Sequence, residues 1–93
     1  MIKTFFSKHE FNLFNNIHTK KIPSALVRIT KKKMVLIHVS TTVEDLRIPP
    51  SNHLEKLSGN RKGQYSIRIN RSYRLCFNYK NGNAYNIEFV DYH

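Results

Sequence analysis

The chain has 93 residues, enough for one domain with a modest core, and its 40% hydrophobic content is that of a folded protein. Sixteen Lys and Arg against six Asp and Glu give a formal net charge of +10, which favours nucleic acid, an anionic membrane or an acidic protein as partner, although a basic surface can also serve solubility alone. One cysteine excludes an internal disulfide. The scattered histidines show no metal-ligand spacing, so no metal or cofactor is expected. No apolar run has the length of a signal-peptide core or membrane span, so we expect a cytoplasmic protein without membrane contact.

Residues 2–6 are predicted to form a short N-terminal strand, followed by a first helix. Ser7 and Glu10 have the spacing of a capping box, which predicts a helix from there to about Ile17. Apolar residues three to four positions apart define its expected buried side, namely Phe11, Leu13, Phe14 and Ile17.

A second helix is predicted to begin near Ile22, with Pro23 in its first turn. Its expected buried stripe comprises Leu26, Ile29, Lys33, Leu36, Ile37 and Ser40. The segment "MVLIHVSTTV" at 34–43 is rich in β-branched residues and fits a strand equally well on propensity alone. Thr42 and Asp45 then repeat the capping-box pattern and predict a short turn over 42–46.

The remainder of the chain predicts a long loop and a three-stranded antiparallel meander. The loop is "RIPPSNHLEKLSGNRKG" at 47–63, and loops of this length are usually functional or mobile. The inward-facing residues of the three strands are Tyr65, Ile67 and Ile69; then Tyr73, Leu75, Phe77 and Tyr79; then Tyr85, Ile87 and Phe89. Keeping all of these on one face requires an odd number of residues in the second turn.

That register places several polar side chains on the other, solvent-exposed face of the sheet. Arg74 then lies opposite Val90, with Tyr92 as its diagonal neighbour, and opposite Arg68 or Asn70 on the first strand. Like charges directly opposed are unfavourable unless an anion lies between them. The pattern therefore predicts a phosphate-binding surface.

Arg68, Arg74, Tyr92 and His93 would lie near one end of that face. Cations that hold a phosphate, with side chains that can exchange protons, suit metal-free cleavage of an RNA phosphodiester. On spacing alone, the arginines could equally be solvated surface residues, and a terminal histidine could be an uninvolved chain end.

The runs "LRIPPSNHLEKLSGNRKGQYSIRINRSYRLCF" and "NGNAYNIEFVDYH", with the opening "MIKTF", resemble HigB-type toxins of the RelE/ParE superfamily. The resemblance implies a single α+β domain over residues 1–93, with two N-terminal helices packed on a small antiparallel sheet. That sheet would comprise the C-terminal three-stranded meander and the N-terminal strand beside its last strand.

The same resemblance implies the toxin of a type II toxin–antitoxin system. Such a toxin cleaves translated mRNA in the ribosomal A site, by 2′-hydroxyl attack without a metal, and inhibits growth. A HigA-type helix-turn-helix antitoxin neutralises it, and DNA is contacted only through the antitoxin complex.

The residues carried over from the family are those that match its motifs. Arg74 matches the arginine that contacts the scissile phosphate, and Tyr92 or His93 would handle protons while Asp91 orients them. Arg61 and Lys62, in the turn between Gly59 and Gly63, would be available to RNA phosphates.

Two family positions differ here. Ser58 stands where many members have lysine before the turn, and Glu55 stands where some have histidine, which predicts weaker cleavage. His53 and Lys56 are candidates to replace them.

Three other readings share the basic charge: an RNA- or ribosome-binding protein without chemistry, a ParE-like topoisomerase inhibitor, and a small ribosomal protein. The terminal "DYH" favours cleavage. In any ribosome-binding reading, the lysine run at 31–33 and the Arg61–Lys62 pair are the expected electrostatic contacts.

Overall fold

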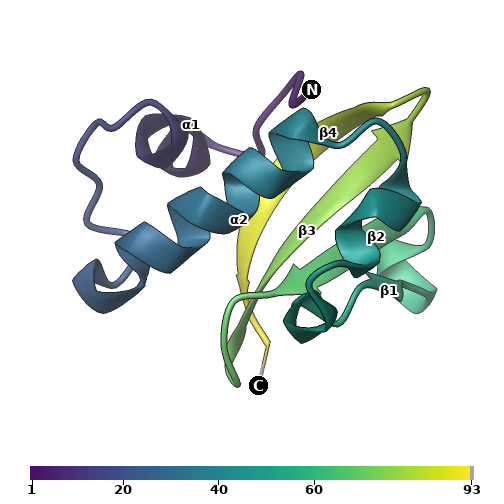
Figure 1. Ribbon diagram of the computed structural model, residues 1–93. Coiled ribbons are helices and arrows are strands. Elements are labelled where there is room, and N and C mark those ends of the chain that lie inside the picture. The colour runs from purple at the N-terminus through teal and green to yellow at the C-terminus, as the bar shows by residue number, and fades with distance from the viewer. Residues whose placement is uncertain (93) are drawn as a thin grey trace.

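The computed structural model describes residues 1–92, in which two helices cover one face of a four-stranded antiparallel sheet (Figure 1). The elements are α1 (Lys8–Phe14), α2 (Val27–Val39), β1 (Glu55–Lys56), β2 (Gln64–Arg68), β3 (Tyr73–Lys80) and β4 (Asn83–Asp91), with short 3₁₀ turns between them. The sheet order is β1-β2-β3-β4. The predicted α+β class is confirmed.

Helix α1 begins as predicted but ends earlier. Ser7 is the N-cap, as predicted, but its hydrogen bonds are not those of a capping box: its side chain accepts from the His9 N–H and donates to the Glu10 side chain. The helix ends at Phe14 rather than near Ile17, because Asn16 takes a left-handed conformation with φ of 62°.

The buried side of α1 also differs from the prediction. Glu10 and Leu13 are buried, whereas Phe11 and Ile17 are 47% and 50% exposed. The Glu10 carboxylate accepts a hydrogen bond of 2.9 Å from the Phe89 N–H, which ties the helix to β4. A polar contact, invisible to hydrophobic periodicity, therefore sets the rotation of this short helix.

Helix α2 resolves the ambiguous β-branched segment as helix, which runs to Val39. It begins at Val27, after a 3₁₀ turn over Ser24–Leu26, so it starts later than predicted. Its buried residues are Thr30, Lys33, Met34 and Ile37, and Ser40, directly after the helix, is buried too. The predicted stripe is therefore right at Lys33, Ile37 and Ser40 but misses Thr30 and Met34.

The lysine on this buried face has a polar partner. The Lys33 ammonium donates to the side-chain oxygen of Asn52, whose amide donates to the Leu46 carbonyl at 3.1 Å. Burial, and to a lesser degree the charge of Lys32, lowers the pKa of Lys33. This network holds the 3₁₀ segments before β1 against α2.

The predicted odd turn between the last two strands is wrong. β3 and β4 are joined through Asn81 and Gly82, whose φ values of 52° and 80° suit a two-residue hairpin turn. Further along the hairpin, a β-bulge returns the apolar side chains of both strands to the same face of the sheet. Cys76 pairs with Glu88 and Asn78 with Tyr85, so β4 contains an extra residue between these pairs.

The N-terminal segment lies beside β4, as expected, although it forms two isolated parallel bridges rather than a full strand. Ile2 bridges Ala84, and Phe5 bridges Ile87. The long loop, in contrast, was not expected to contain a strand. Within it, β1 pairs with β2 and places Glu55 opposite Ser66.

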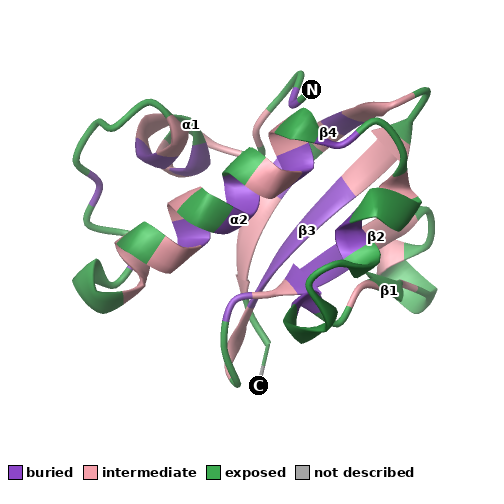
Figure 2. Cartoon of the chain, in the orientation of Figure 1, coloured by how far each residue is buried: buried purple, intermediate pink, exposed green. Residues whose placement is uncertain are grey.

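The hydrophobic core lies between α2 and the sheet, where buried segments of both face each other (Figure 2). Its fully buried members include Met34, Ile37, Ile67, Leu75, Phe77 and Ile87. None of the helices within residues 1–92 has the length and apolar composition needed to cross a membrane.

Candidate functional site

The candidate site lies on the face of the sheet turned away from α2, which we call the outer face. Side chains alternate along a strand, so Arg74 and Cys76 point to the outer face while Leu75 and Phe77 enter the core. An opening of about 390 Å³, the arginine pocket, is lined there by His53, Glu55, Arg68, Asn70, Arg71, Arg74 and Tyr92.

Arg74 is at the centre of this pocket, but it is 7% exposed rather than solvated as predicted. Its Nε donates to Ser66 Oγ at 2.8 Å, and its Nη2 donates to the carbonyls of His53 and, at 3.5 Å, of Ser66. Its Nη1 lies 3.3 Å from a carboxylate oxygen of Glu55. The unpredicted strand β1 and the turn before it therefore surround this arginine.

The predicted proximity of Tyr92 to Arg74 is confirmed. The Arg74 guanidinium carbon lies 5.5 Å from the centre of the Tyr92 ring, a cation–π distance. The Tyr92 N–H donates to the Ser72 carbonyl at 2.6 Å, which fixes the end of β4 beside the β2–β3 turn. Asp91 is the last residue of β4, opposite Tyr73. His93 lies outside the described residues.

Two further arginines line the pocket. Arg68, one of the two predicted alternatives, lies directly opposite Arg74, and its Nε donates to the Asn70 carbonyl at 3.1 Å. Among residues 1–92, no carboxylate forms an ion pair with Arg68 or Arg71. Sequence reasoning missed Arg71 because it lies in the turn, outside the alternation of the strands. The spacing of arginines at 68, 71 and 74 across a hairpin turn was its only signal.

The loop candidates divide between two openings. His53 has a left-handed backbone with φ of 44° and lines the arginine pocket together with Glu55. Lys56 and Ser58 instead line a neighbouring opening of about 270 Å³. Tyr92 borders both openings, so the two openings are adjacent.

Arg61 is not available to phosphates in the way predicted. Its Nη1 lies 3.0 Å from one carboxylate oxygen of Glu88 and its Nη2 3.5 Å from the other, and Nη1 also donates to Gln64 at 3.0 Å. The hydrogen bond to Glu88 raises the pKa of Arg61. Lys62 is exposed, and its predicted contact with RNA stays a prediction.

The lysine run at 31–33 does not form one cationic surface either. The Lys31 ammonium donates to the Phe14 carbonyl at 2.6 Å and to the Asn16 side chain at 2.8 Å. Lys33 is buried, and only Lys32 of the three is exposed. The predicted cluster therefore reduces to a single solvated charge.

Cys76 lies on the outer face beneath these charged groups and is fully buried. Burial raises the pKa of its thiol, as do the negative charges of Glu88 and Glu55, while Arg61 and Arg74 act in the opposite direction. Within residues 1–92, no three His, Cys, Asp or Glu side chains are grouped as metal ligands would be.

Comparison with known proteins identifies relatives over the whole chain. The family model described as "RelE-like toxin of type II toxin-antitoxin system HigB" matches residues 3–93. "Toxin HigB-1" of Vibrio cholerae is 42% identical over 72 residues, covering 77% of this chain and 75% of the relative. "Endoribonuclease HigB" of Proteus vulgaris is 31% identical over 93 residues, covering both chains completely.

A solved structure shares the fold. A chain of the "YoeB-YefM complex from Staphylococcus aureus" matches with a TM-score of 0.58 and 20% identity, covering 100% of this chain and 98% of that one. At 20% identity, this similarity shows a shared fold and nothing more.

Proposed function

The chain belongs to the HigB-like family of RelE-like toxins of type II toxin–antitoxin systems, and we propose that it is an endoribonuclease that cleaves translated mRNA on the ribosome. The proposed action stops translation and growth in the cytoplasm. A HigA-type helix-turn-helix antitoxin is the proposed neutralising partner, and contact with DNA is proposed only through the antitoxin complex.

The observation that carries the proposal is how the Arg74 guanidinium is held in the arginine pocket. Its guanidinium is oriented by Ser66 and by the His53 carbonyl, and its Nη1 meets a single oxygen of Glu55. A carboxylate and a phosphate oxygen make similar hydrogen bonds to a guanidinium. An RNA phosphate that displaces Glu55 would therefore find a preorganised cation, with Arg68 and Arg71 at the same opening.

The proposed reaction needs no metal. A base removes the 2′-hydroxyl proton, O2′ attacks the phosphorus, and the P–O5′ bond breaks to leave a 2′,3′-cyclic phosphate. An acid protonates the departing O5′. We assign the proton transfers to Tyr92 and His93, with Asp91 as the orienting group and Arg74 on the developing phosphate charge. His53 and Lys56 are the proposed loop contacts to RNA, alongside Lys62.

Arg61 is left out of these contacts, because Glu88 already holds its guanidinium. The net charge of +10 supports association with ribosomal RNA, and that association is expected to weaken steeply with salt. Membership of a family of toxins from type II toxin–antitoxin systems supports an antitoxin partner.

The test is induction of the protein in growing cells, with mapping of mRNA 5′ ends, with and without a co-expressed HigA-type antitoxin. We expect new 5′ ends within translated regions, growth arrest, and suppression of both by the antitoxin. His93→Gln should lose ~10²–10⁴-fold in cleavage, because glutamine cannot exchange a proton at neutral pH. Growth arrest without new mRNA ends would refute cleavage and favour a ParE-like target.

A further inference from the structure

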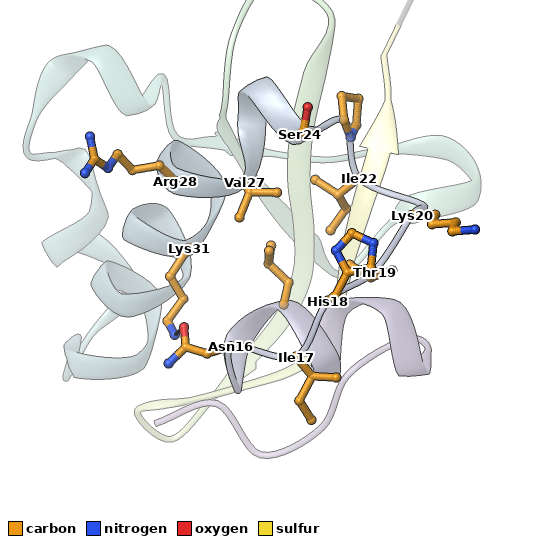
Figure 3. Close-up of a pocket in the computed structure, with 12 residues that line it drawn as sticks. Asn16, Ile17, His18, Thr19, Lys20, Ile22, Ser24, Val27, Arg28 and Lys31 are labelled. Carbon is orange, nitrogen blue, oxygen red and sulfur yellow. Dashed lines mark hydrogen bonds between the residues drawn. The ribbon is translucent and has the colours of Figure 1, made fainter.

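The helical layer contains a third opening, which the proposed RNA chemistry does not use. It has a volume of about 650 Å³ and lies between α1, the segment that follows it, and the start of α2 (Figure 3). We call it the helical groove. Its lining falls within residues 13–31, so it shares no residue with the arginine pocket.

The floor of the helical groove is apolar. Leu13 and Ile22 are buried core residues, and Val27 is partly buried. Figure 3 shows Ile22 and Val27 on either side of the opening. Ile17, which lines the same groove, is half exposed because α1 ends before it. An exposed isoleucine beside an apolar hollow offers more contact area than a single surface residue usually does.

The rim of the helical groove is cationic. Lys20 and Arg28 are both exposed, and Figure 3 shows their side chains extending on opposite sides of the opening. Lys31 also lines it, but its ammonium already donates to the Phe14 carbonyl and to Asn16. Among the described residues that line the groove, none is acidic.

We propose that the helical groove binds an acidic amphipathic segment of the antitoxin, an inference that rests on the proposed function because it assumes that partner. Apolar side chains of the segment would pack on Ile17 and Ile22, and its carboxylates would meet Lys20 and Arg28. This combination of a buried apolar anchor and a complementary charged rim is typical of specific protein interfaces.

Two other occupants fit the surface less well. A second copy of this chain would bring its own net charge of +10 and an equally cationic rim, so the two would repel. RNA would gain from the cations but would leave the apolar floor uncovered, whereas the arginine pocket offers it charge without such a floor. A segment that is both acidic and apolar satisfies both parts of the helical groove.

The proposal predicts that the antitoxin segment binds while the arginine pocket stays open. The test uses the ¹⁵N-labelled full chain and a synthetic helical peptide of about 14 residues, with Leu on one face and Glu on the other. Two matched peptides replace all Glu with Lys or all Leu with Ser. We expect the acidic amphipathic peptide alone to shift the amide signals of Ile17, Ile22 and Val27.

Variants of the chain localise the binding further. Ile17→Asp and Arg28→Glu should each weaken the peptide at least ~10-fold, since one removes an apolar anchor and the other reverses a rim charge. Val39→Asp and Lys80→Glu are the controls, because both alter exposed residues outside the groove and should leave affinity unchanged. All four variants should still cleave mRNA, so loss of peptide binding would not count against the proposed nuclease.

The inference is overturned if the acidic amphipathic peptide shifts no signal, or shifts those of Arg68, Arg71 and Tyr92 instead. It is also overturned if the Leu-to-Ser peptide binds equally well, because binding would then be purely electrostatic. Equal affinity of the peptide for the parent chain and for both groove variants would also overturn the inference. If cleavage itself is absent while the peptide binds in the groove, the proposed function fails and the docking site stands.

Discussion

The outer face of the sheet carries two arginine–glutamate pairs, which differ in how firmly the glutamate is held by its arginine. Arg61 meets both carboxylate oxygens of Glu88, whose side chain is 19% exposed, and it also donates to Gln64. Arg74 is the more deeply buried arginine, yet it meets only one oxygen of Glu55, whose side chain is 53% exposed.

The difference distinguishes a pair that stabilises the fold from a pair that can open. Glu88 would have to leave two contacts and a largely buried position to release Arg61. Glu55 can turn into water, while Ser66 and His53 keep the Arg74 guanidinium in place for a different anion. A buried arginine with a half-exposed acidic partner therefore indicates an anion-binding site more strongly than an exposed arginine does.

The largest expected effect separates the two arginines directly. Arg74→Ala should reduce mRNA cleavage by ~10²–10³-fold, because it removes the charge that stabilises the transition state. It should also lower the free energy of unfolding by about 2 kcal/mol, since hydrogen bonds from a charged, buried donor are lost. Arg61→Ala, the matched control, should cleave normally and lose about 1 kcal/mol or less. Mapped 5′ ends and urea denaturation measure the two effects.

Arg71 lines the pocket of the Arg74–Glu55 pair, so it tests whether that pocket is the one that binds RNA. Arg71→Gln should weaken binding of a short RNA by about 3–10-fold and reduce the slope of log affinity against log salt by about one. Fluorescence anisotropy at several salt concentrations measures both quantities. Lys80→Gln removes an exposed cation from the other hairpin and serves as the control. An identical salt slope in the two variants would exclude Arg71 from the RNA site.

Removing the acidic partners tests which pair can open. Glu55→Gln should tighten binding of an RNA with 2′-O-methyl groups, which lacks the attacking hydroxyl. The gain should be roughly 2–5-fold, corresponding to an ion pair worth about 1 kcal/mol or less. Glu88→Gln should leave RNA affinity unchanged. Weaker binding by the Glu55 variant would show that Glu55 assists RNA binding rather than competing with it.

Cys76 provides a test on stability alone, at the position where the charges of both pairs meet. Because burial raises the pKa of the thiol above 9.0, the unfolded chain releases this proton at lower pH than the folded chain. The free energy of unfolding should therefore fall as pH rises above 9.0, by at most about 1.4 kcal/mol per pH unit from this group. Urea denaturation at pH 8 and pH 10 should show a smaller decline in Cys76→Ala.

The strands were more predictable than the site. Strict alternation in β2 and β3 identified both strands and their core face, and it narrowed the partner of Arg74 to Arg68 or Asn70, of which the structure shows Arg68. The turn was mispredicted because pairing arguments assumed a regular ladder, whereas a bulge near Asn86 allows a two-residue turn. The rotation of α1 depended on Glu10 reaching β4, a distant contact without a local pattern.

The burial of Arg74 was unpredictable for a similar reason. Strand β1 contains only Glu55 and Lys56 and lies in a loop dense in proline, glycine and polar residues, so no periodicity marks it. Yet this strand and the residue before it supply the carboxylate and the carbonyl that surround Arg74. The family motifs pointed to candidate residues, but which of them contact one another could be seen only in the folded chain.

The pairing of the N-terminal segment with β4 has a consequence for how the protein is made. Ile2 meets Ala84 and Phe5 meets Ile87, so the segment that contains Ile2 and Phe5 must wait for β4, which is synthesised much later. Contacts this distant in sequence carry a large loop-closure entropy and form late in folding. Until β4 has left the ribosomal exit tunnel, Ile2 and Phe5 have no sheet edge to pair with. Their apolar side chains are therefore exposed while the residues between them and β4 are being translated.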